Sequence, residues 1–274
     1  NIPVTLSHLR RGAKSDAEFP PATAANPAVV DVMVLYTPAT SARYGVSGIQ
    51  ARILQAVADA NTAYLRSQVY ITLNLVHSTE VSFTETGNML DALVALVSPN
   101  DGRLDEAHVL RSQHGADLVV LVDEDVNYAG ISYMMGAPNV GFAPYAFSVT
   151  GSGYLPYFTM HHEMGHNMGC DHDRASSGGG GSFPYSYGFQ RCTMDGTGFR
   201  TVMSYPCPSG FASRINYFSN PGVPFNGRPL GIAFEADPVN ASENARSLNQ
   251  TAHYVAAFCT RPEPPPAAPQ NLSA

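Results

Sequence analysis

Residues 161–173 read His161-His162-Glu163-Met164-Gly165-His166-Asn167-Met168-Gly169-Cys170-Asp171-His172-Asp173. This stretch has the pattern H-E-x-x-H-x-x-G-x-x-H. His162 and His166 are four residues apart, so on a helix they lie one turn apart on the same face and can bind one zinc ion together. Glu163 is adjacent to them and can act as a general base on a water molecule at the metal.

Gly169 is where this helix is expected to end, because only glycine enters the left-handed backbone conformation at low cost. The resulting turn would bring His172 back as a third ligand. Three histidines leave the fourth position of a tetrahedral zinc ion open, as in catalytic sites. A structural zinc site usually closes all four positions, often with cysteine, and has no need for Glu163.

The pattern resembles the metzincin clan of zinc metallopeptidases, in which a tight turn with a methionine lies beneath the metal. Thr201-Val202-Met203-Ser204-Tyr205 occupies the corresponding place in this chain. The resemblance implies that Met203 packs under the ligands and that Asp173 accepts a hydrogen bond that fixes the turn or a ligand. It also implies that Tyr205 donates a hydrogen bond to the reaction's oxyanion or ligates resting zinc. A core tyrosine is the alternative for Tyr205, and we interpret His161 as an ordinary helix residue.

Within this clan the chain most resembles the bacterial peptidyl-Asp metallopeptidases, which are reprolysin-like. The stretches that carry this resemblance are residues 30–38, 110–119 and 142–147 together with the zinc stretch. The resemblance implies a metzincin α/β (α+β) fold. Such a fold has a five-stranded mixed sheet with one antiparallel edge strand, helices above it, a zinc helix and a small irregular lower subdomain that ends in a C-terminal helix.

Hydrophobic periodicity independently predicts alternating strands and helices. The predicted strands are residues 29–36, 71–75 and 118–122, and the predicted helices between them are 47–67, 89–97 and 104–114. This order indicates right-handed crossovers and a mainly parallel sheet. Two short strands at 130–134 and 145–149, the zinc helix at 158–168 and a C-terminal helix from residue 242 follow.

The domain organisation follows from composition and from the resemblance. Residues 29–261 are predicted to form the catalytic domain, with the lower half beginning after His172. Residues 1–28 are interpreted as an N-terminal arm or the remnant of a pro-segment. Residues 262–274 are predicted to be a proline-rich linker that leads to the first strand of a fibronectin type III module, or alternatively a disordered tail.

The 274 residues carry a net charge of −7 and a single lysine, Lys14. This length supports one large domain with a substantial core. No basic stripe predicts a nucleic-acid partner, and no apolar run is long enough to span a membrane. We therefore expect a monomer that acts on protein or peptide substrates, without nucleic-acid or membrane partners.

Four cysteines are present, and none forms C-x-x-C. An even count favours two disulfides in an oxidising compartment, and no signal peptide is visible, so we expect the mature part of a secreted, bacterial protein. We predict Cys192–Cys207, which would close a short loop around the Met203 turn and stabilise the fold by roughly 3 kcal/mol. We also predict Cys170–Cys259, which would tie the C-terminal helix to the segment after the zinc helix.

Substrate-binding residues are predicted from the resemblance. Gly130, Ile131 and Ser132 would lie on the edge strand at the rim of the cleft and pair with an extended peptide, or simply form an ordinary edge strand. Arg214 is the one charged residue in 206–219, the segment after the methionine turn that would form the wall for the residue following the cut bond. Its guanidinium would hold the carboxylate of Asp, and more weakly Glu. A surface role for Arg214 stays open, and Arg191 and Arg200 are the next candidates.

The leading hypothesis is a secreted zinc endopeptidase with one catalytic zinc, in which Glu163 takes the proton of the attacking water. Calcium is a further candidate cofactor, since secreted relatives often carry it, although no EF-hand loop is present. One alternative is a non-catalytic secreted binding or adhesion protein that retains the fold. Another is a latent form held shut by residues 1–28, with Asp16 as the nearest group that could block the zinc.

Overall fold

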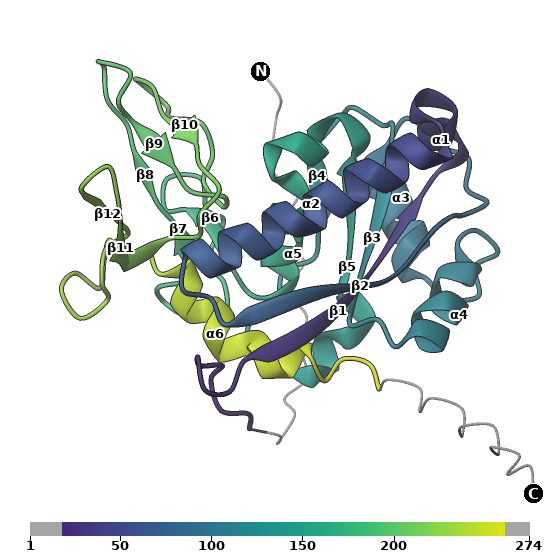
Figure 1. Cartoon of the computed structure of the whole chain (residues 1–274), viewed down its shortest axis with the longest axis horizontal. Helices are drawn as coiled ribbons and strands as arrows, with labels where there is room; N and C mark the ends of the chain where they lie inside the picture. Colours follow the sequence, from purple (N-terminus) through teal and green to yellow (C-terminus); the bar gives the residue numbers. More distant parts are fainter. Residues whose placement is uncertain (1–17, 261–274) are drawn as a thin grey trace, which may run out of the picture.

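The computed structural model describes residues 18–260. Its five-stranded sheet is organised around β1 (Ala28–Tyr36), a nearly continuous apolar run whose last seven residues are all buried. β1 pairs in parallel with β2 (Ile71–Glu80) on one side and with β3 (Leu118–Asp123) on the other. β5 (Phe147–Gly151) pairs in parallel with β3, and β4 (Gly130–Ser132) pairs antiparallel with β5. The strand order is β2-β1-β3-β5-β4, which confirms the predicted mixed sheet with one antiparallel edge strand (Figure 1).

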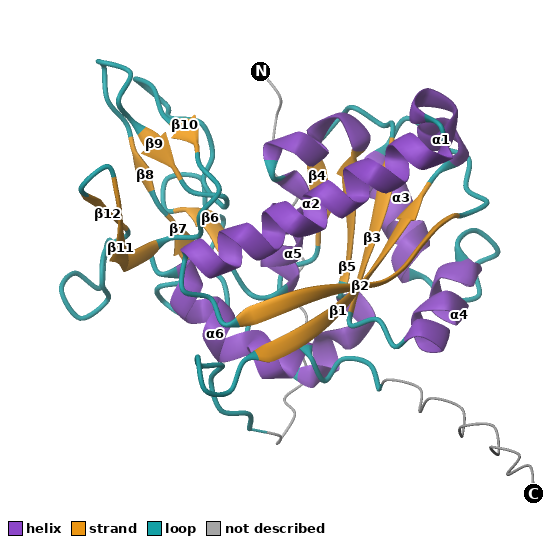
Figure 2. Cartoon of the chain, viewed as in Figure 1, coloured by secondary structure: helices purple, strands orange, loops and turns teal. Residues whose placement is uncertain are grey.

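Helices cover both faces of this sheet (Figure 2). They are α1 (Pro38–Tyr44), α2 (Val46–Arg66), α3 (Met89–Val97), α4 (Asp105–His114), α5 (Thr159–Asn167) and α6 (Asn244–Val255). β2 and β3 lie on opposite sides of β1, so right-handed connections place α2 on one face and α3 with α4 on the other. Alternate β1 residues therefore enter two cores. Val32 and Val34 pack in the core that includes α2, α5 and α6, and Met33 and Leu35 pack in the core with α3 and α4.

Two elements near β1 differ from the sequence prediction. Thr37-Pro38 ends the strand as expected but also begins α1, because the Thr37 hydroxyl accepts from the Thr40 N–H and proline occupies the first turn. β2 continues to Glu80 instead of ending near residue 75. The register with β1 shifts between Val32 and Met33, opposite Leu75 and His77, and this irregularity interrupts the alternating pattern from which the strand was predicted.

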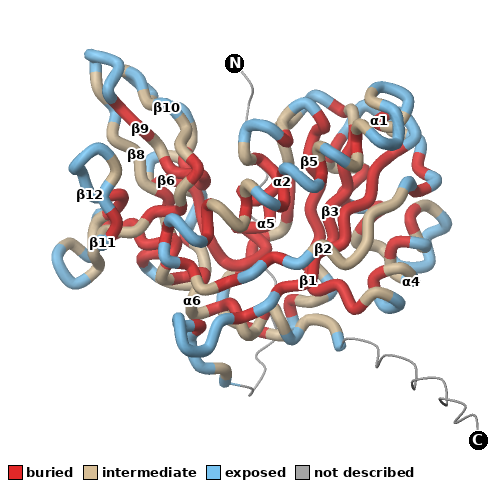
Figure 3. The backbone as a smooth tube through the Cα atoms, in the orientation of Figure 1, coloured by how far each residue is buried: buried red, intermediate tan, exposed pale blue. Residues whose placement is uncertain are grey.

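The second half of the chain has little regular structure before α6. Short 3₁₀ turns, η1 (Val140–Tyr145) and η2 (Ser152–Tyr157), flank β5. After α5 come only short strands, which are β6 (Asp171–Asp173), β7 (Tyr187–Gly188), β8 (Gln190–Arg191), β9 (Phe199–Arg200), β10 (Ser213–Arg214), β11 (Asn220–Phe225) and β12 (Arg228–Leu230). They pair in three small sheets, and the two formed by β8–β10 and by β11 with β12 enclose a minor core of Phe199, Val223 and Leu230. The turns beyond β8 and between β11 and β12 are exposed, whereas the central sheet is buried (Figure 3).

The segment before β1 packs on the C-terminal helix. The Ala22 N–H donates to the Asn249 carbonyl at 2.7 Å, and the rings of Phe19 and Tyr254 meet edge to face. The described part of the predicted N-terminal arm is therefore held against α6. Asp16, with the rest of residues 1–17, and the predicted linker at 262–274 lie outside the described residues. Within residues 18–260, no helix combines the length and apolar character needed to cross a membrane.

One predicted disulfide is formed and the other is not. Cys192 and Cys207 are bonded, with their Cα atoms 5.9 Å apart. Cys170 and Cys259 are free thiols, so the predicted Cys170–Cys259 pairing is wrong. Cys170 Sγ contacts the carbonyl of Asn244, the first residue of α6, whereas Cys259 follows the other end of this helix. A helix of 12 residues is about 18 Å long, and a disulfide requires Cα atoms within about 7 Å.

Gly169 directs the chain out of α5 and into β6. Its φ of +90° lies in the region that favours glycine, as the sequence predicts. Space is also restricted there, because a Cβ at this position would lie 2.1 Å from Ser182 Oγ and 2.8 Å from Ser182 Cβ. The Cys170 N–H donates back to the Gly165 carbonyl, which closes the turn. Backbone conformation and close packing both require glycine at position 169. The position of His172 depends on this turn, because the turn leads directly into β6.

We predict that Gly169→Ala destabilises the metal-free protein by about 3 kcal/mol, whereas Gly196→Ala costs only about 1 kcal/mol. Gly196 has a similar φ of +78° but no atom within 4 Å of an added Cβ, so it measures the backbone cost alone. Denaturant unfolding of the two variants after zinc removal measures the difference. Equal destabilisation of both would show that the contact with Ser182 does not constrain the turn.

Candidate active site

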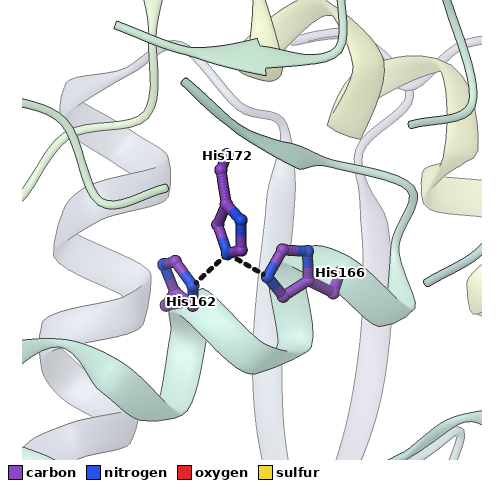
Figure 4. A group of neighbouring side chains, drawn as sticks. All are labelled: His162, His166 and His172. Atoms are coloured by element: carbon purple, nitrogen blue, oxygen red, sulfur yellow. Dashed lines mark hydrogen bonds between the residues drawn. The ribbon is translucent and has the colours of Figure 1, made fainter. Parts of the chain in front are cut away.

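Three histidines converge where α5 meets the lower half. His162 and His166 come from α5, and His172 comes from β6 on the opposite side (Figure 4). Nε2 of His172 lies 3.3 Å from Nε2 of His162 and 3.0 Å from Nε2 of His166. Tetrahedral zinc with Zn–N bonds of about 2.0–2.1 Å holds its nitrogen ligands about 3.3 Å apart. Among residues 18–260, these three histidines form the one group of three or more potential metal ligands whose ligand atoms all lie within 4.8 Å of one another.

Backbone carbonyls fix how two of these rings are turned. Nδ1 of His162 lies 2.8 Å from the Val202 carbonyl oxygen, and Nδ1 of His166 lies 2.8 Å from that of Cys170. A carbonyl can only accept, so each Nδ1 carries the proton and each Nε2 presents a lone pair to the shared point. Burial, and then the neighbouring His166, hold the pKa of His162 well below its usual value, which keeps the ring neutral. The arrangement of the three rings therefore fits a zinc ion bound through their Nε2 atoms.

Asp171 supports the third ligand. Its Oδ1 accepts from the His172 N–H at 2.7 Å and lies 3.9 Å from His172 Nδ1. Its Oδ2 accepts from the Ser177 hydroxyl and from the Gly180 N–H at 2.8 Å. The glycine-rich loop after His172 is thus fastened to Asp171, the residue beside the ligand. Acidic residues flank His172 on both sides in the sequence, and this pattern is the local sign of such support. The sequence analysis assigns a supporting role to Asp173 alone and overlooks Asp171.

Glu163 lies beside the three histidines and is almost completely buried. Its Oε2 accepts a hydrogen bond from the Ser132 hydroxyl at 2.8 Å. Burial raises the pKa of Glu163 to about 8, and the Ser132 hydrogen bond and the positive charge of Arg214 oppose this rise. A carboxyl group with such a pKa can both accept and return a proton near neutral pH.

Met203 lies directly against the zinc helix. Its side chain is fully buried, and a Cβ added at Gly165 would lie 2.6 Å from its Sδ. The preceding residue of the same turn, Val202, supplies the carbonyl that orients His162. The turn therefore supports the helix from below by packing and orients one histidine by a hydrogen bond.

Tyr205 and Asp173 connect the turn to the ligands. The Tyr205 ring centroid is 4.1 Å from that of His172, and burial raises the pKa of its hydroxyl, so the phenol stays protonated. Asp173 Oδ2 accepts from the Tyr205 N–H at 2.9 Å, and Oδ1 accepts from Gln190 Nε2 at 2.8 Å. One carboxylate thereby ties β6 to the methionine turn and to β8. Gln190 was not predicted, since no local pattern marks it.

Arg214 lies next to the site and interacts with backbone. Its Nε donates to the Val202 carbonyl at 3.1 Å and its Nη1 to the Tyr157 carbonyl at 2.9 Å. Its Nη2 is 2.9 Å from His162 Nδ1, a close contact between two N–H groups that share the Val202 oxygen. Arg214 lies in β10 and is paired with Arg200 in the neighbouring strand β9. Burial, and then the nearby charge of Arg200, lower the pKa of Arg214 to about 9.

The remaining predicted residues are placed as follows. Gly130, Ile131 and Ser132 form β4 at the edge of the sheet, beside α5. Arg191 pairs with Phe199 in the lower half. His161 is buried and its Nε2 contacts Asn216 Oδ1 at 2.9 Å, consistent with an ordinary helix residue outside the three-histidine group.

Several known proteins are similar to this chain. It is 35% identical to a peptidyl-Asp metalloendopeptidase of Stenotrophomonas maltophilia (strain R551-3), over 86% of this chain and 54% of the relative. It is 36% identical to one of Xanthomonas campestris pv. campestris, over 86% of this chain and 53% of the relative. A third, of Pseudomonas aeruginosa, is 34% identical over 86% of this chain and 41% of the relative. The chain thus spans about half the length of the first two curated relatives and a smaller share of the third.

A solved structure described as "Structure of a chaperone-substrate complex" contains a chain with the same fold. The TM-score is 0.65 at 16% sequence identity, and the match covers 88% of this chain and 41% of that one. The Reprolysin_5 family model, described as metallo-peptidase family M12, matches residues 26–219. That match contains the whole sheet, the three histidines and the methionine turn, and the chain therefore belongs to metallo-peptidase family M12.

Proposed function

We propose that this protein is a secreted zinc endopeptidase that hydrolyses protein or peptide substrates. The observation that carries the proposal is the convergence of the Nε2 atoms of His162, His166 and His172 beside the buried carboxyl group of Glu163. The disulfide Cys192–Cys207 supports an oxidising, extracellular location. The proposal includes zinc alone, because three converging imidazole nitrogens are a ligand set that suits this metal.

The residues have separate roles in hydrolysis. Zinc held by the three histidines would polarise the substrate carbonyl and lower the pKa of a bound water to about 7. Glu163 accepts a proton from the attacking water and later returns it to the leaving amine. Burial acts to raise the pKa of Glu163, which helps this carboxyl group to retain the proton between the two steps. The protonated phenol of Tyr205 donates a hydrogen bond to the developing oxyanion.

The substrate would bind as an extended peptide along β4. This strand has a paired edge toward β5 and no strand on its other side among residues 18–260. An extended peptide can use the backbone groups of such an edge as an added strand. The alternative of a non-catalytic binding protein has no support in the site, because the three histidines and Glu163 are all present.

The proposed specificity is cleavage on the N-terminal side of Asp, and more weakly of Glu. The relatives named peptidyl-Asp metalloendopeptidases are consistent with this preference. Arg214 and Arg200 are register partners, and neither forms an ion pair in the part of the chain that the structure describes. Two adjacent, partly buried guanidinium groups attract an anion, and a carboxylate would relieve their mutual repulsion. Arg214 is the proposed primary contact for the substrate carboxylate, since its guanidinium lies against the ligand His162. Arg200 would add to the positive electrostatic potential at the same place.

We predict that Glu163→Gln lowers kcat by about 10²–10⁴-fold while zinc stays bound, because Gln cannot accept the proton and Glu163 is not a ligand. The measurement is hydrolysis of an Asp-containing peptide together with the zinc content of the variant. Glu243→Gln is the control, since Glu243 is also buried but lies at α6. Activity near the parent level in Glu163→Gln would remove this residue as the base, and loss of zinc would make it a structural support.

We predict that a zinc chelator abolishes hydrolysis and that added Zn²⁺ restores it. The reason is that three neutral imidazoles bind zinc reversibly, and chelation removes the group that polarises the carbonyl. The readout is cleavage of casein before chelation, after it and after zinc is returned. Hydrolysis that persists without metal would contradict the proposal, and no hydrolysis under any condition would favour the binding-protein or latent alternatives.

We predict that Arg214→Gln reduces the preference for Asp over Asn after the cut bond by about 10–100-fold in kcat/KM. Gln keeps a donor for the Val202 carbonyl but has no charge, and Asn matches Asp in shape. Arg200→Gln should give a smaller loss, and Arg191→Gln should give none. Cut sites in a mixed peptide library supply the measurement. Frequent cuts before Leu or Phe in the parent would exclude acidic specificity, and an unchanged preference in Arg214→Gln would assign the contact to another residue.

A further inference from the structure

The edge strand β4 presents two residues to α5 on one face. Side chains alternate along a strand, so Gly130 and Ser132 share a face and Ile131 lies on the other. Ile131 is buried in the core with Phe147 and Val149, which anchors the strand from behind. The pairing with β5 sets Gly130 opposite Thr150 and Ser132 opposite Ser148. This short strand is therefore held in register and packs closely against the zinc helix.

Ser132 locates one oxygen of the Glu163 carboxyl group. Its hydroxyl donates to Oε2 at 2.8 Å, and the exposed fractions of Ser132 and Glu163 are only 5% and 4%. Water therefore competes little for this hydrogen bond. A hydrogen bond in such a low-dielectric setting is electrostatically stronger than one at the surface.

Gly130 locates the other oxygen by leaving room for it. A Cβ at this position would lie 2.6 Å from Glu163 Oε1 and Cγ and 2.8 Å from Cδ, closer than real contacts allow. Gly130 does not have a positive φ, so an alanine here would be tolerated by the backbone. The requirement for glycine is one of space alone, and any side chain would move the carboxyl group.

We propose that Gly130 and Ser132 are positioning residues that fix both carboxyl oxygens of Glu163. This inference rests on the proposed role of Glu163 as the base. Ser132 holds Oε2 by a hydrogen bond, and Gly130 leaves the volume that Oε1 occupies. The strand whose backbone edge would bind the substrate thus also sets the place of the group that moves the proton. A displacement of a reacting group by about 1 Å can cost about 10²-fold in rate.

The test compares Ser132→Ala and Ser132→Thr with Ser148→Ala. Ser148 is the register partner of Ser132 and is fully buried, but no hydrogen bond joins its hydroxyl to Glu163. We expect Ser132→Ala to lower kcat about tenfold with KM within about twofold of the parent, since the hydroxyl acts on the base and not on the substrate. Ser132→Thr should recover most of kcat, and Ser148→Ala should match the parent. Zinc content should stay unchanged in all three.

Gly130→Ala tests the positioning of Glu163 separately, because it leaves the Ser132 hydroxyl in place and changes only the space beside Oε1. We expect kcat to fall by about 10²-fold as the added Cβ displaces the carboxyl group. A double variant, Glu163→Gln with Ser132→Ala, should be no slower than Glu163→Gln alone, because Ser132 acts through Glu163.

Several outcomes would overturn the inference. They are a full kcat in Ser132→Ala, a rise in KM with kcat unchanged, or a further tenfold loss in the double variant. The failure of the proposed function is distinguishable from these. If Glu163→Gln is inactive while Ser132→Ala keeps the kcat of Ser148→Ala, only the positioning role fails. If Glu163→Gln itself remains active, the proposed base fails.

Discussion

The hydrogen bonds from two histidine Nδ1 atoms to backbone carbonyls are the constraint on which the site depends. Each bond settles the tautomer and the tilt of one ring, so that the Nε2 lone pairs of His162 and His166 meet that of His172. One carbonyl belongs to Val202, far from α5 in sequence, and the other follows the turn at Gly169. The irregular lower half is therefore needed even where it supplies no ligand. Asp173 and the disulfide Cys192–Cys207 hold the methionine turn to which Val202 belongs.

The two halves of the molecule contribute different properties to one centre. The lower half orients the ligands from one side, and the sheet supplies an edge strand that contacts Glu163 from the other. Burial between them lowers the pKa of His162 and raises that of Glu163, which keeps both groups uncharged more readily than in water. Neutral imidazoles suit a cation, and a carboxyl group near its pKa suits proton transfer. The same burial thus supports metal binding and the proposed acid–base chemistry.

The sequence predicts those features that leave a local pattern. Apolar patterning identified β1, β3, α3 and α4 closely, because the two strands are nearly continuous apolar runs and the two helices carry apolar residues on their buried sides. The ligand spacing on α5 and the glycine at its end follow from helix geometry. α1 was missed because Thr37-Pro38 both ends a strand and caps a helix. The pairing Cys170–Cys259 was wrong because spacing does not show that α6 separates the two thiols. The carbonyl of Val202, Gln190 and the Ser132–Glu163 hydrogen bond depend on contacts between distant segments, which no local pattern records.

X-ray absorption spectroscopy of the zinc-loaded protein tests the proposed centre most directly, because it reports the ligand atoms around the metal. The arrangement of the three histidines predicts one zinc per chain, with three imidazole nitrogens at about 2.0–2.1 Å and one further light-atom ligand. His172→Ala should lose one imidazole from this shell. A sulfur ligand at about 2.3 Å, or a shell unchanged by His172→Ala, would contradict the three-histidine centre.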